Sequence, residues 1–142
     1  MGRKIKKNSG DGVPEFQAVH RYARISPSKV RVVMNQIRGI SVSEALDQLR
    51  FSPRRGAFMI NKVLVSAIAN MDHKVAEGHD DIEGWEDMDA EDLYVHEAFV
   101  DVGPSFRRWR PRARGMACPI IKRSSHITIK LRPQARSLAE QS

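Results

Sequence analysis

The fold is decided by residues 93–131, which read LYVHEAFVDVGPSFRRWRPRARGMACPIIKRSSHITIKL. Residues 93–102 are rich in good strand formers, and residues 120–131 form a second candidate strand whose last half alternates large aliphatic with polar side chains. Gly103-Pro104 interrupts the first strand, and residues 105–118 are basic and punctuated by proline and glycine. We therefore predict one β-hairpin over about residues 93–131, with its tip at about 105–118.

The length of this hairpin predicts that its tip projects from the rest of the molecule. A straight strand from Tyr94 to about Arg108 would reach on the order of 45 Å at ~3.3 Å per residue. A small globular body is only ~30 Å across. Because a two-stranded ribbon alone is marginally stable in water, the projecting part needs a surface to lie against.

The tip has the composition of an RNA-binding segment. Between Ser105 and Gly115, five arginines fall within eight residues, and Phe106 and Trp109 lie among them. Arginine binds phosphate through two donors, and aromatic rings stack on bases, which suits folded RNA with unstacked nucleotides. The alternative is a solvated basic loop, but two aromatic side chains are unfavourable in such a loop.

Two further basic groups flank the tip. Lys122-Arg123-Ser124-Ser125-His126 lies on the returning strand, where an exposed strand face without a ligand is an equally good interpretation. Arg21, Arg24, Lys29 and Arg31 surround the start of the first predicted helix, whose N-terminal dipole also favours phosphate.

Three helices are predicted in the first half of the chain. The first begins at Ser26-Pro27, where serine is a good N-cap and proline fits the first helical position, and it ends before Gly39. The second begins with the capping box Ser41-Val42-Ser43-Glu44. The third begins at Ser52-Pro53 and carries a long apolar stripe, which is typical of a central helix.

These elements predict an α+β fold, namely a small domain of three helices and an antiparallel β-sheet with a long protruding β-hairpin. A short strand over residues 16–22 completes the sheet. We expect residues 15–131 to form a single domain, preceded by a flexible basic arm over residues 1–14 and followed by a flexible tail over 132–142.

Charge is segregated along the chain and favours a polyanionic partner. The 142 residues carry a net charge of +7, but residues 76–101 contain eleven carboxylates and no lysine or arginine. The rest of the chain therefore stands at +18, a load that repels itself unless it meets negative charge. The acidic loop over residues 77–92 lacks periodicity and is expected to be solvated.

Several function classes are excluded by what the sequence lacks. A single cysteine, Cys118, excludes an internal disulfide, and no apolar run is long enough to span a membrane. The acidic loop fails the EF-hand pattern, no metal-ligand spacing is present, and no nucleotide-binding or hydrolase motif occurs. We expect no catalytic residue, no metal and no cofactor.

Seven short motifs occur in the order of a known family. The chain resembles the bacterial type of the large-subunit ribosomal protein twenty-two family over about residues 16–131. The motifs are ARISPSKVR at 23–31, IRG at 37–39, KVL at 62–64, SAIAN at 66–70, VDVGP at 100–104, PRARG at 111–115 and KRSSHITI at 122–129.

This resemblance implies a small α/β domain on the ribosome surface whose hairpin is buried in rRNA. The family's hairpin tip lines the nascent-chain exit tunnel, and the family helps the rRNA fold during assembly. The resemblance implies these rRNA-binding residues: Arg107, Arg108, Trp109, Arg110, Arg112 and Arg114 at the tip, Lys122, Arg123, Ser124 and His126 on the returning strand, and Arg24, Lys29 and Arg31 on the body.

The implied partners are large-subunit rRNA, neighbouring large-subunit ribosomal proteins and the nascent peptide, in the large subunit of the cytoplasmic ribosome. We expect no membrane partner and no homo-oligomer. Two positions depart from the family pattern: Val102 stands where the family often has glutamate, and the acidic loop is longer than usual. Because phosphate would repel this loop, we expect it to face solvent or a neighbouring protein.

Three other functions use parts of the same sequence. A free RNA chaperone would use the same basic residues away from the ribosome. A protein-interaction module would use the helical stripe, which must then be exposed. An RNA hydrolase would use His126 beside Ser124 and Ser125 as base and nucleophile, with no identified acid to orient the histidine.

Overall fold

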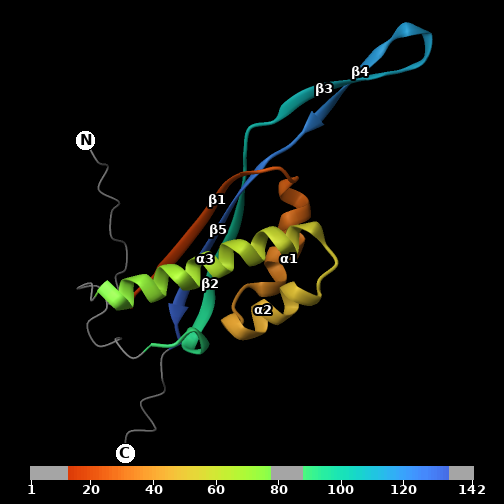
Figure 1. Ribbon diagram of the computed structural model, residues 1–142. Coiled ribbons are helices and arrows are strands. Elements are labelled where there is room, and N and C mark those ends of the chain that lie inside the picture. Colours follow the sequence, from red (N-terminus) through yellow and green to blue (C-terminus); the bar gives the residue numbers. More distant parts are fainter. Residues whose placement is uncertain (1–12, 78–87, 135–142) are drawn as a thin grey trace, which may run out of the picture.

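A three-stranded antiparallel sheet in the order β1-β5-β2 forms the base of the molecule (Figure 1). β1 spans Phe16–Ala23, β5 spans Ser125–Pro133 and β2 spans Leu93–Val102. This computed structural model describes residues 13–77 and 88–134. Most of the predicted basic arm, acidic loop and C-terminal tail therefore lies outside the described residues.

Three helices pack against this sheet. α1 (Pro27–Ile37) contacts β2, and α3 (Arg55–Glu77) crosses β1 and β5, as Figure 1 shows. α2 (Val42–Phe51) packs against α3. None of these helices is both long enough and apolar enough to cross a membrane. The predicted α+β class is confirmed.

The central strand β5 supplies the middle of the core. Ile127, Ile129 and Leu131 are fully buried, as their alternation in the sequence predicts. They join one hydrophobic cluster with the apolar stripes of α1 and α3. The stripe residues are therefore buried in the core. The protein-interaction alternative needs them exposed, so it is wrong.

The helix starts follow the sequence signals only in part. α1 begins at Pro27, but Ser26 makes no side-chain capping bond to it. At α2, Ser41 Oγ accepts a hydrogen bond from the Glu44 N–H at 3.3 Å, as the capping box predicts. Gly39, which ends α1, has φ of 81°, a conformation that glycine adopts readily.

The predicted start of α3 at Ser52-Pro53 is wrong, because α3 begins at Arg55. Ser52 instead ends α2 with extended backbone, φ −75° and ψ 122°. The residue before a proline is forced out of helical geometry, so this Ser-Pro pair stops one helix before the next begins. The connection between α2 and α3 is therefore longer than the sequence signals predict.

The predicted second strand over 120–131 is divided in two. β4 (Ala117–Lys122) is separated from β5 by Arg123-Ser124, and β3 (Phe106–Pro111) is separated from β2 by residues 103–105. β2 pairs with β5, and β3 pairs with β4, each antiparallel. The chain still forms the one predicted hairpin. Its two halves are separate ladders, β2 with β5 and β3 with β4, and the pairing is interrupted between them.

The chain ends of the body extend further than expected. β5 continues to Pro133, two residues beyond the expected end of the domain at residue 131. The Arg132 side chain is held by Glu15 at 3.0 Å, and this contact keeps the strand end on the sheet. At the other end, Pro14 is buried and belongs to the body, although it was expected in the flexible arm.

The ribbon of β3 and β4, which we call the arm, projects beyond the sheet and helices, as the reach of the hairpin predicts (Figure 1). A single 3₁₀ turn, η3 (Ala113–Gly115), closes its tip. Arg114 and Gly115 both have positive φ, at 57° and 66°. The Arg112 N–H donates to the Met116 carbonyl at 2.7 Å across this turn.

Candidate nucleic-acid interface

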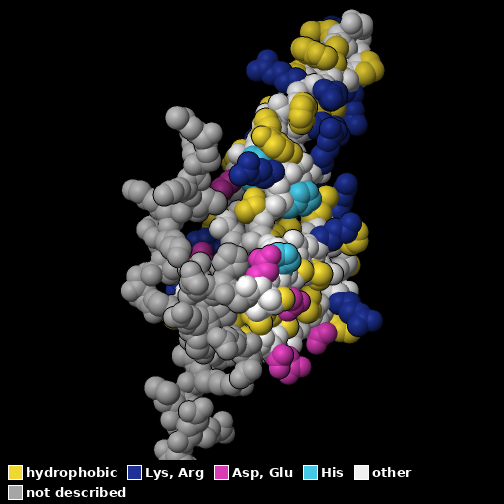
Figure 2. Space-filling model, turned by 60° about the vertical axis from the view of Figure 1, so that its left-hand side comes forward, with side chains coloured by type: hydrophobic (Ala, Val, Ile, Leu, Met, Phe, Trp, Pro, Cys, Tyr) yellow, Lys and Arg dark blue, Asp and Glu magenta, His cyan; other side chains and the backbone are white. Residues whose placement is uncertain are grey.

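The arm has no hydrophobic core of its own. Every side chain of β3 is exposed, and Trp109 is 68% exposed. Six residue pairs connect the two strands, from Phe106 opposite Lys122 to Pro111 opposite Ala117. Figure 2 shows lysine and arginine side chains along this ribbon with hydrophobic ones between them. The ribbon is held mainly by its backbone ladder.

The register gives the arm two different faces, because directly opposed residues lie on the same face of an antiparallel pair. One face carries Arg108, Arg110 and Lys122, together with the ring of Phe106. The other face carries Trp109 opposite Pro119, with Arg107 as its one cation among the strand residues. One face is therefore suited to phosphates and the other to bases or other flat apolar groups.

A short junction fixes the arm to the body. The Gly103 N–H donates to the Ser124 carbonyl at 3.0 Å, and the Ser124 hydroxyl donates to the Pro104 carbonyl. Ser124 is only 2% exposed. The hydroxyl of this predicted rRNA-binding residue is thus occupied in joining the two strands where the ladders break.

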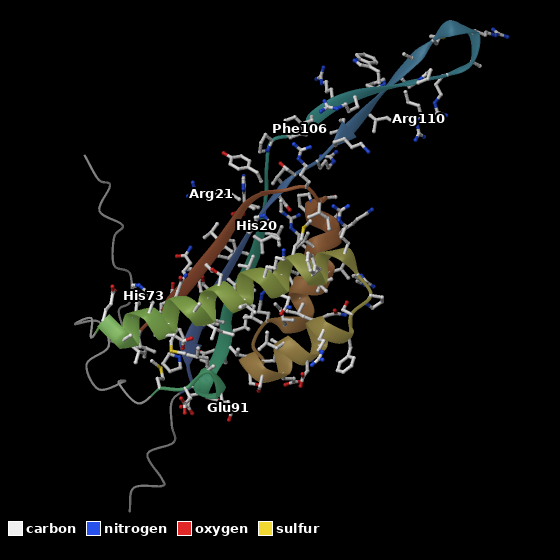
Figure 3. All side chains as sticks on the ribbon, in the orientation of Figure 1. His20, Arg21, His73, Glu91, Phe106 and Arg110 are labelled. Carbon is white, nitrogen blue, oxygen red and sulfur yellow. The ribbon has the colours of Figure 1, made fainter. Side chains whose placement is uncertain are left out.

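His126 also belongs to this junction. β1 has a bulge near Tyr22, whose φ is 59°, and the Tyr22 N–H donates to His126 Nδ1 at 3.1 Å. The two rings meet edge to face with centroids 4.9 Å apart. The half-buried imidazole therefore has one nitrogen engaged in positioning the end of β1 (Figure 3 labels the neighbouring His20 and Arg21).

The basic residues assigned on the body are all exposed, and they differ in whether their charged groups already bind the protein's own backbone. Arg24 lies over the Phe106 ring at 5.5 Å, which brings it to the base of the arm, and Lys29 is exposed. Arg31 instead donates to the Val100 carbonyl through Nε at 3.2 Å and Nη2 at 2.9 Å. Arg24 and Lys29 thus extend the basic surface of the arm, whereas Arg31 holds β2.

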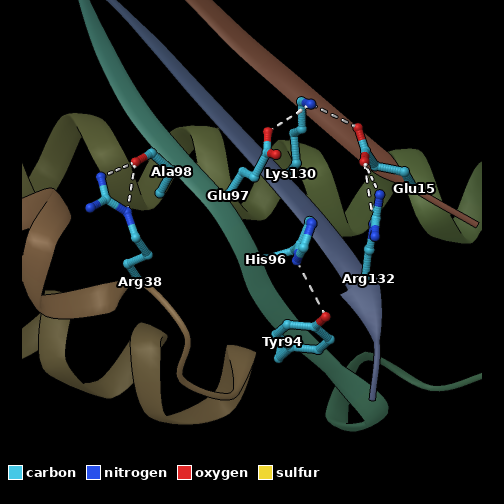
Figure 4. Close-up of polar contacts among 8 residues, drawn as sticks. All are labelled: Glu15, Arg38, Tyr94, His96, Glu97, Ala98, Lys130 and Arg132. Carbon is cyan, nitrogen blue, oxygen red and sulfur yellow. Dashed lines mark hydrogen bonds and ion pairs between the residues drawn. The ribbon is translucent and has the colours of Figure 1, made fainter. Parts of the chain in front are cut away.

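The two cations of β5, Lys130 and Arg132, are paired with carboxylates. Lys130 lies between Glu97 at 2.7 Å and Glu15 at 3.2 Å, and Arg132 also binds Glu15 (Figure 4). The hydrogen bond from Lys130 lowers the pKa of Glu97, and the same bond raises the pKa of Lys130. Because these charges are neutralised, this part of the sheet is a poor phosphate site.

The structure also reveals a cluster that the sequence interpretation missed. Arg50, Arg54, Arg55 and Lys62 are exposed around the α2–α3 connection, together with Phe51 and Phe58. The only available signal was that both phenylalanines fall outside the apolar stripes. Within the described ranges, no three histidine, cysteine, aspartate or glutamate side chains come together as metal ligands would.

The ribosomal protein L22p/L17e family matches residues 18–132. The chain belongs to this family. The "Large ribosomal subunit protein uL22" of Ligilactobacillus salivarius is 48% identical over 117 residues, which are 82% of this chain and 92% of that protein. The proteins of the same name from Finegoldia magna and Synechococcus are 44% and 46% identical, over 93% and 91% of their own lengths.

Membership of the L22p/L17e family confirms the resemblance on which the site residues were assigned. It makes the chain a structural ribosomal protein and not an enzyme, so the RNA hydrolase alternative is wrong. The match begins two residues into β1, covers all three helices, β2 and the arm, and ends one residue before the end of β5.

Proposed function

We propose that this L22p/L17e-family protein is a structural part of the large subunit of the cytoplasmic ribosome, where it binds and organises rRNA during assembly. The observation that carries this proposal is the arm, a ribbon without a core whose side chains are exposed cations and aromatic rings. Such a ribbon is stable only against a surface, and its charge requires that surface to be anionic.

The described contacts suggest how the work is divided among the assigned residues. The exposed ones that do not hold another element of the body contact RNA, namely Arg24, Lys29, Arg107, Arg108, Trp109, Arg110, Arg112, Arg114, Lys122 and Arg123. Arg31, Ser124 and His126 act indirectly, because their polar groups hold β2, the junction and β1. Residues 15–131 act in this proposal as one rRNA-binding domain.

The same proposal places the tip of the arm in the wall of the nascent-chain exit tunnel. The tip is the part of the arm farthest from the body, and Met116 there is exposed. Its partners are then the rRNA around it, neighbouring large-subunit proteins, and the peptide passing by. The tight turn at Arg114-Gly115 keeps this end narrow.

Salt-dependent binding to deproteinised large-subunit rRNA tests the proposed role of the arm in rRNA binding. The variant Arg108→Gln/Arg110→Gln should reduce the slope of log affinity against log salt by about 0.7–0.9 for each phosphate that the variant no longer neutralises. The control Ser66→Glu/Ala69→Glu changes the net charge by the same two units on exposed positions of α3. Equal slopes for the two variants would contradict the proposal.

Site-specific photocrosslinking tests the proposed position of the tip in the wall of the exit tunnel. A crosslinker at position 116, in ribosomes carrying a stalled nascent chain, should label that chain. A crosslinker at Val19, which is exposed on β1 of the body, should not. If only the body position labels the nascent chain, the tip does not line the tunnel.

A further inference from the structure

The place where the arm leaves the body contains an imidazole that holds neighbouring backbone. We propose that His126 fixes the direction of the arm while it is neutral, and that protonation of its Nδ1 atom releases the arm from that direction. We call the residues involved the hinge, namely His126, Tyr22, Arg24, Gly103 and Phe106. This inference goes beyond the proposed function, because it concerns the free chain and requires no RNA.

His126 accepts a hydrogen bond that only its neutral form can accept. The Tyr22 N–H donates to His126 Nδ1 at 3.1 Å, so the proton of the neutral ring is on Nε2. In the imidazolium form both ring nitrogens carry protons, and Nδ1 would face the Tyr22 N–H as a second donor. Protonation of the ring is therefore incompatible with this contact.

Tyr22 has a backbone conformation that needs support from its surroundings. Its φ is 59°, and within residues 13–77 and 88–134 Arg114 is the one other residue besides glycine with positive φ. Bulky side chains rarely adopt this region unless the surrounding structure holds them there. The Tyr22 ring is exposed, and its contact with the imidazole is edge to face. Without the hydrogen bond, this end of β1 should relax toward ordinary extended backbone.

The imidazole and Tyr22 are connected to the base of the arm by two further contacts. The imidazole lies against the outgoing chain, since a Cβ atom at Gly103 would be 3.2 Å from His126 Nε2. The guanidinium of Arg24, two residues after Tyr22, lies 5.5 Å from the centroid of the Phe106 ring at the start of β3. Figure 3 labels Phe106 where the arm leaves the body. A change at His126 therefore reaches the arm through Gly103 and through Arg24.

The imidazolium has a second partner close by. Asp101 of β2 is directly opposite His126 in the register, so the two side chains lie on one face of the sheet. Within the described ranges Asp101 has no ion pair of its own. The cations around the imidazole are Arg21 and Arg24 at the end of β1, and Arg123 and Lys130 on the returning strand. Histidine is the side chain that ordinarily changes charge between pH 5 and 8, so mild acid should move the ring from Tyr22 toward Asp101.

Two measurements on the full chain without RNA, at about pH 7.5 and about pH 5, test the hinge. In acid, the Tyr22 amide should lose protection from hydrogen exchange on the order of tenfold, the effect of losing one hydrogen bond. Spin labels at Ile121→Cys near the base of the arm and at Ser66→Cys on α3, in a Cys118→Ser chain, should give a distance distribution that broadens in acid. Amides of the buried strand β5 should stay protected at both pH values.

Three variants show whether His126 is the group responsible. His126→Asn puts a carbonyl oxygen near the position of Nδ1, and this oxygen accepts a hydrogen bond but takes up no proton in this range. Its distance distribution should be narrow at both pH values, whereas His126→Leu, which has no acceptor, should be broad at both. His73→Asn removes an exposed histidine far from the arm, as Figure 3 shows, and should keep the full response to pH.

The hinge proposal is overturned if the distance distribution of the chain with His126 is the same at both pH values. It is also overturned if His126→Asn broadens in acid as that chain does. Should His126→Leu fail to fold, the comparison between His126 and His126→Asn still decides. None of these results bears on RNA binding by the exposed side chains of the arm, so the proposed function stands or falls on its own experiments.

Discussion

Gly103 stands where even a methyl group does not fit. A Cβ atom there would lie 2.6 Å from the Ser124 hydroxyl oxygen and 3.2 Å from His126 Nε2. The Ser124 hydroxyl cannot move away freely, because it is buried and donates to the Pro104 carbonyl. The direction of the arm therefore depends on the absence of one side chain.

Gly103→Ala should lower the free energy of unfolding by about 1–3 kcal/mol, the usual cost of overpacking a buried site. Urea unfolding measures this change. Adding Ser124→Ala removes the atom nearest to the new methyl group, so the double variant should be less destabilised than the sum of the two single variants. Additive effects would show that the crowding at Ser124 is not the cause.

Lys130 links the stability of the sheet to pH through its ion pair with Glu97. Its hydrogen bond lowers the pKa of Glu97 below the ordinary 4.5, so the stabilisation from Glu97 is present above that value and is lost as pH falls through the lowered pKa. The raised pKa of Lys130 means that its contribution is present below its ordinary 10.5 and is lost as pH rises through the higher value.

Lys130→Met should therefore be less stable than the native chain near neutral pH, and this difference should shrink in acid below pH 4.5. The destabilisation should be below about 1 kcal/mol, because the Glu97 side chain is 47% exposed and screened by water. Unfolding free energies from pH 3 to 7 measure it. If the difference in unfolding free energy stayed constant over that range, lost packing and not the lost ion pair would be its cause.

At the scale of the element, β2 is an edge strand whose free side is covered by arginine. Arg38 donates to the Ala98 carbonyl and Arg31 to the Val100 carbonyl, each through two nitrogens. Both arginines come from α1 or its C-terminal end. This arrangement satisfies backbone groups that would otherwise invite a second strand to pair.

Arg31→Lys/Arg38→Lys keeps both charges but removes the paired donors, so it should cost about 1–3 kcal/mol of stability. Amide exchange in β2 should become faster. The control Lys29→Arg, at an exposed position of the same helix, should leave stability unchanged. If the double variant is as stable as the native chain and only its RNA affinity falls, these arginines serve RNA binding rather than the edge of β2.

Local sequence patterns predicted the helices and strands well, but they did not predict the bulges and breaks that connect these elements. The alternation in β5 and the capping signals of α2 involve near neighbours, so the sequence displays them directly. The bulge at Tyr22 is completed by His126, 104 residues away, and the breaks at Gly103 and Ser124 meet only after folding. The same distance hid the structural use of Arg31, which looked like a free basic residue beside a helix start.

For the whole molecule, the contrast between body and arm predicts two levels of order. The sheet and helices share one core, whereas β3 and β4 contact mainly each other. In the free protein, amides from about residue 105 to 118 should exchange fast, and those of β5 slowly. Binding to large-subunit rRNA should protect the arm, and protection equal to that of β5 without RNA would contradict this account.

The strand order β1-β5-β2 also determines when the sheet can form during synthesis of the chain. The middle strand of the sheet is the last one made, so β1 and β2 lack their partner strand until β5 has been added. Helices can form and touch earlier, but the buried Ile127, Ile129 and Leu131 are still missing from their interior. While it is being translated, the chain thus displays its cationic segments before it has a finished body to present them from.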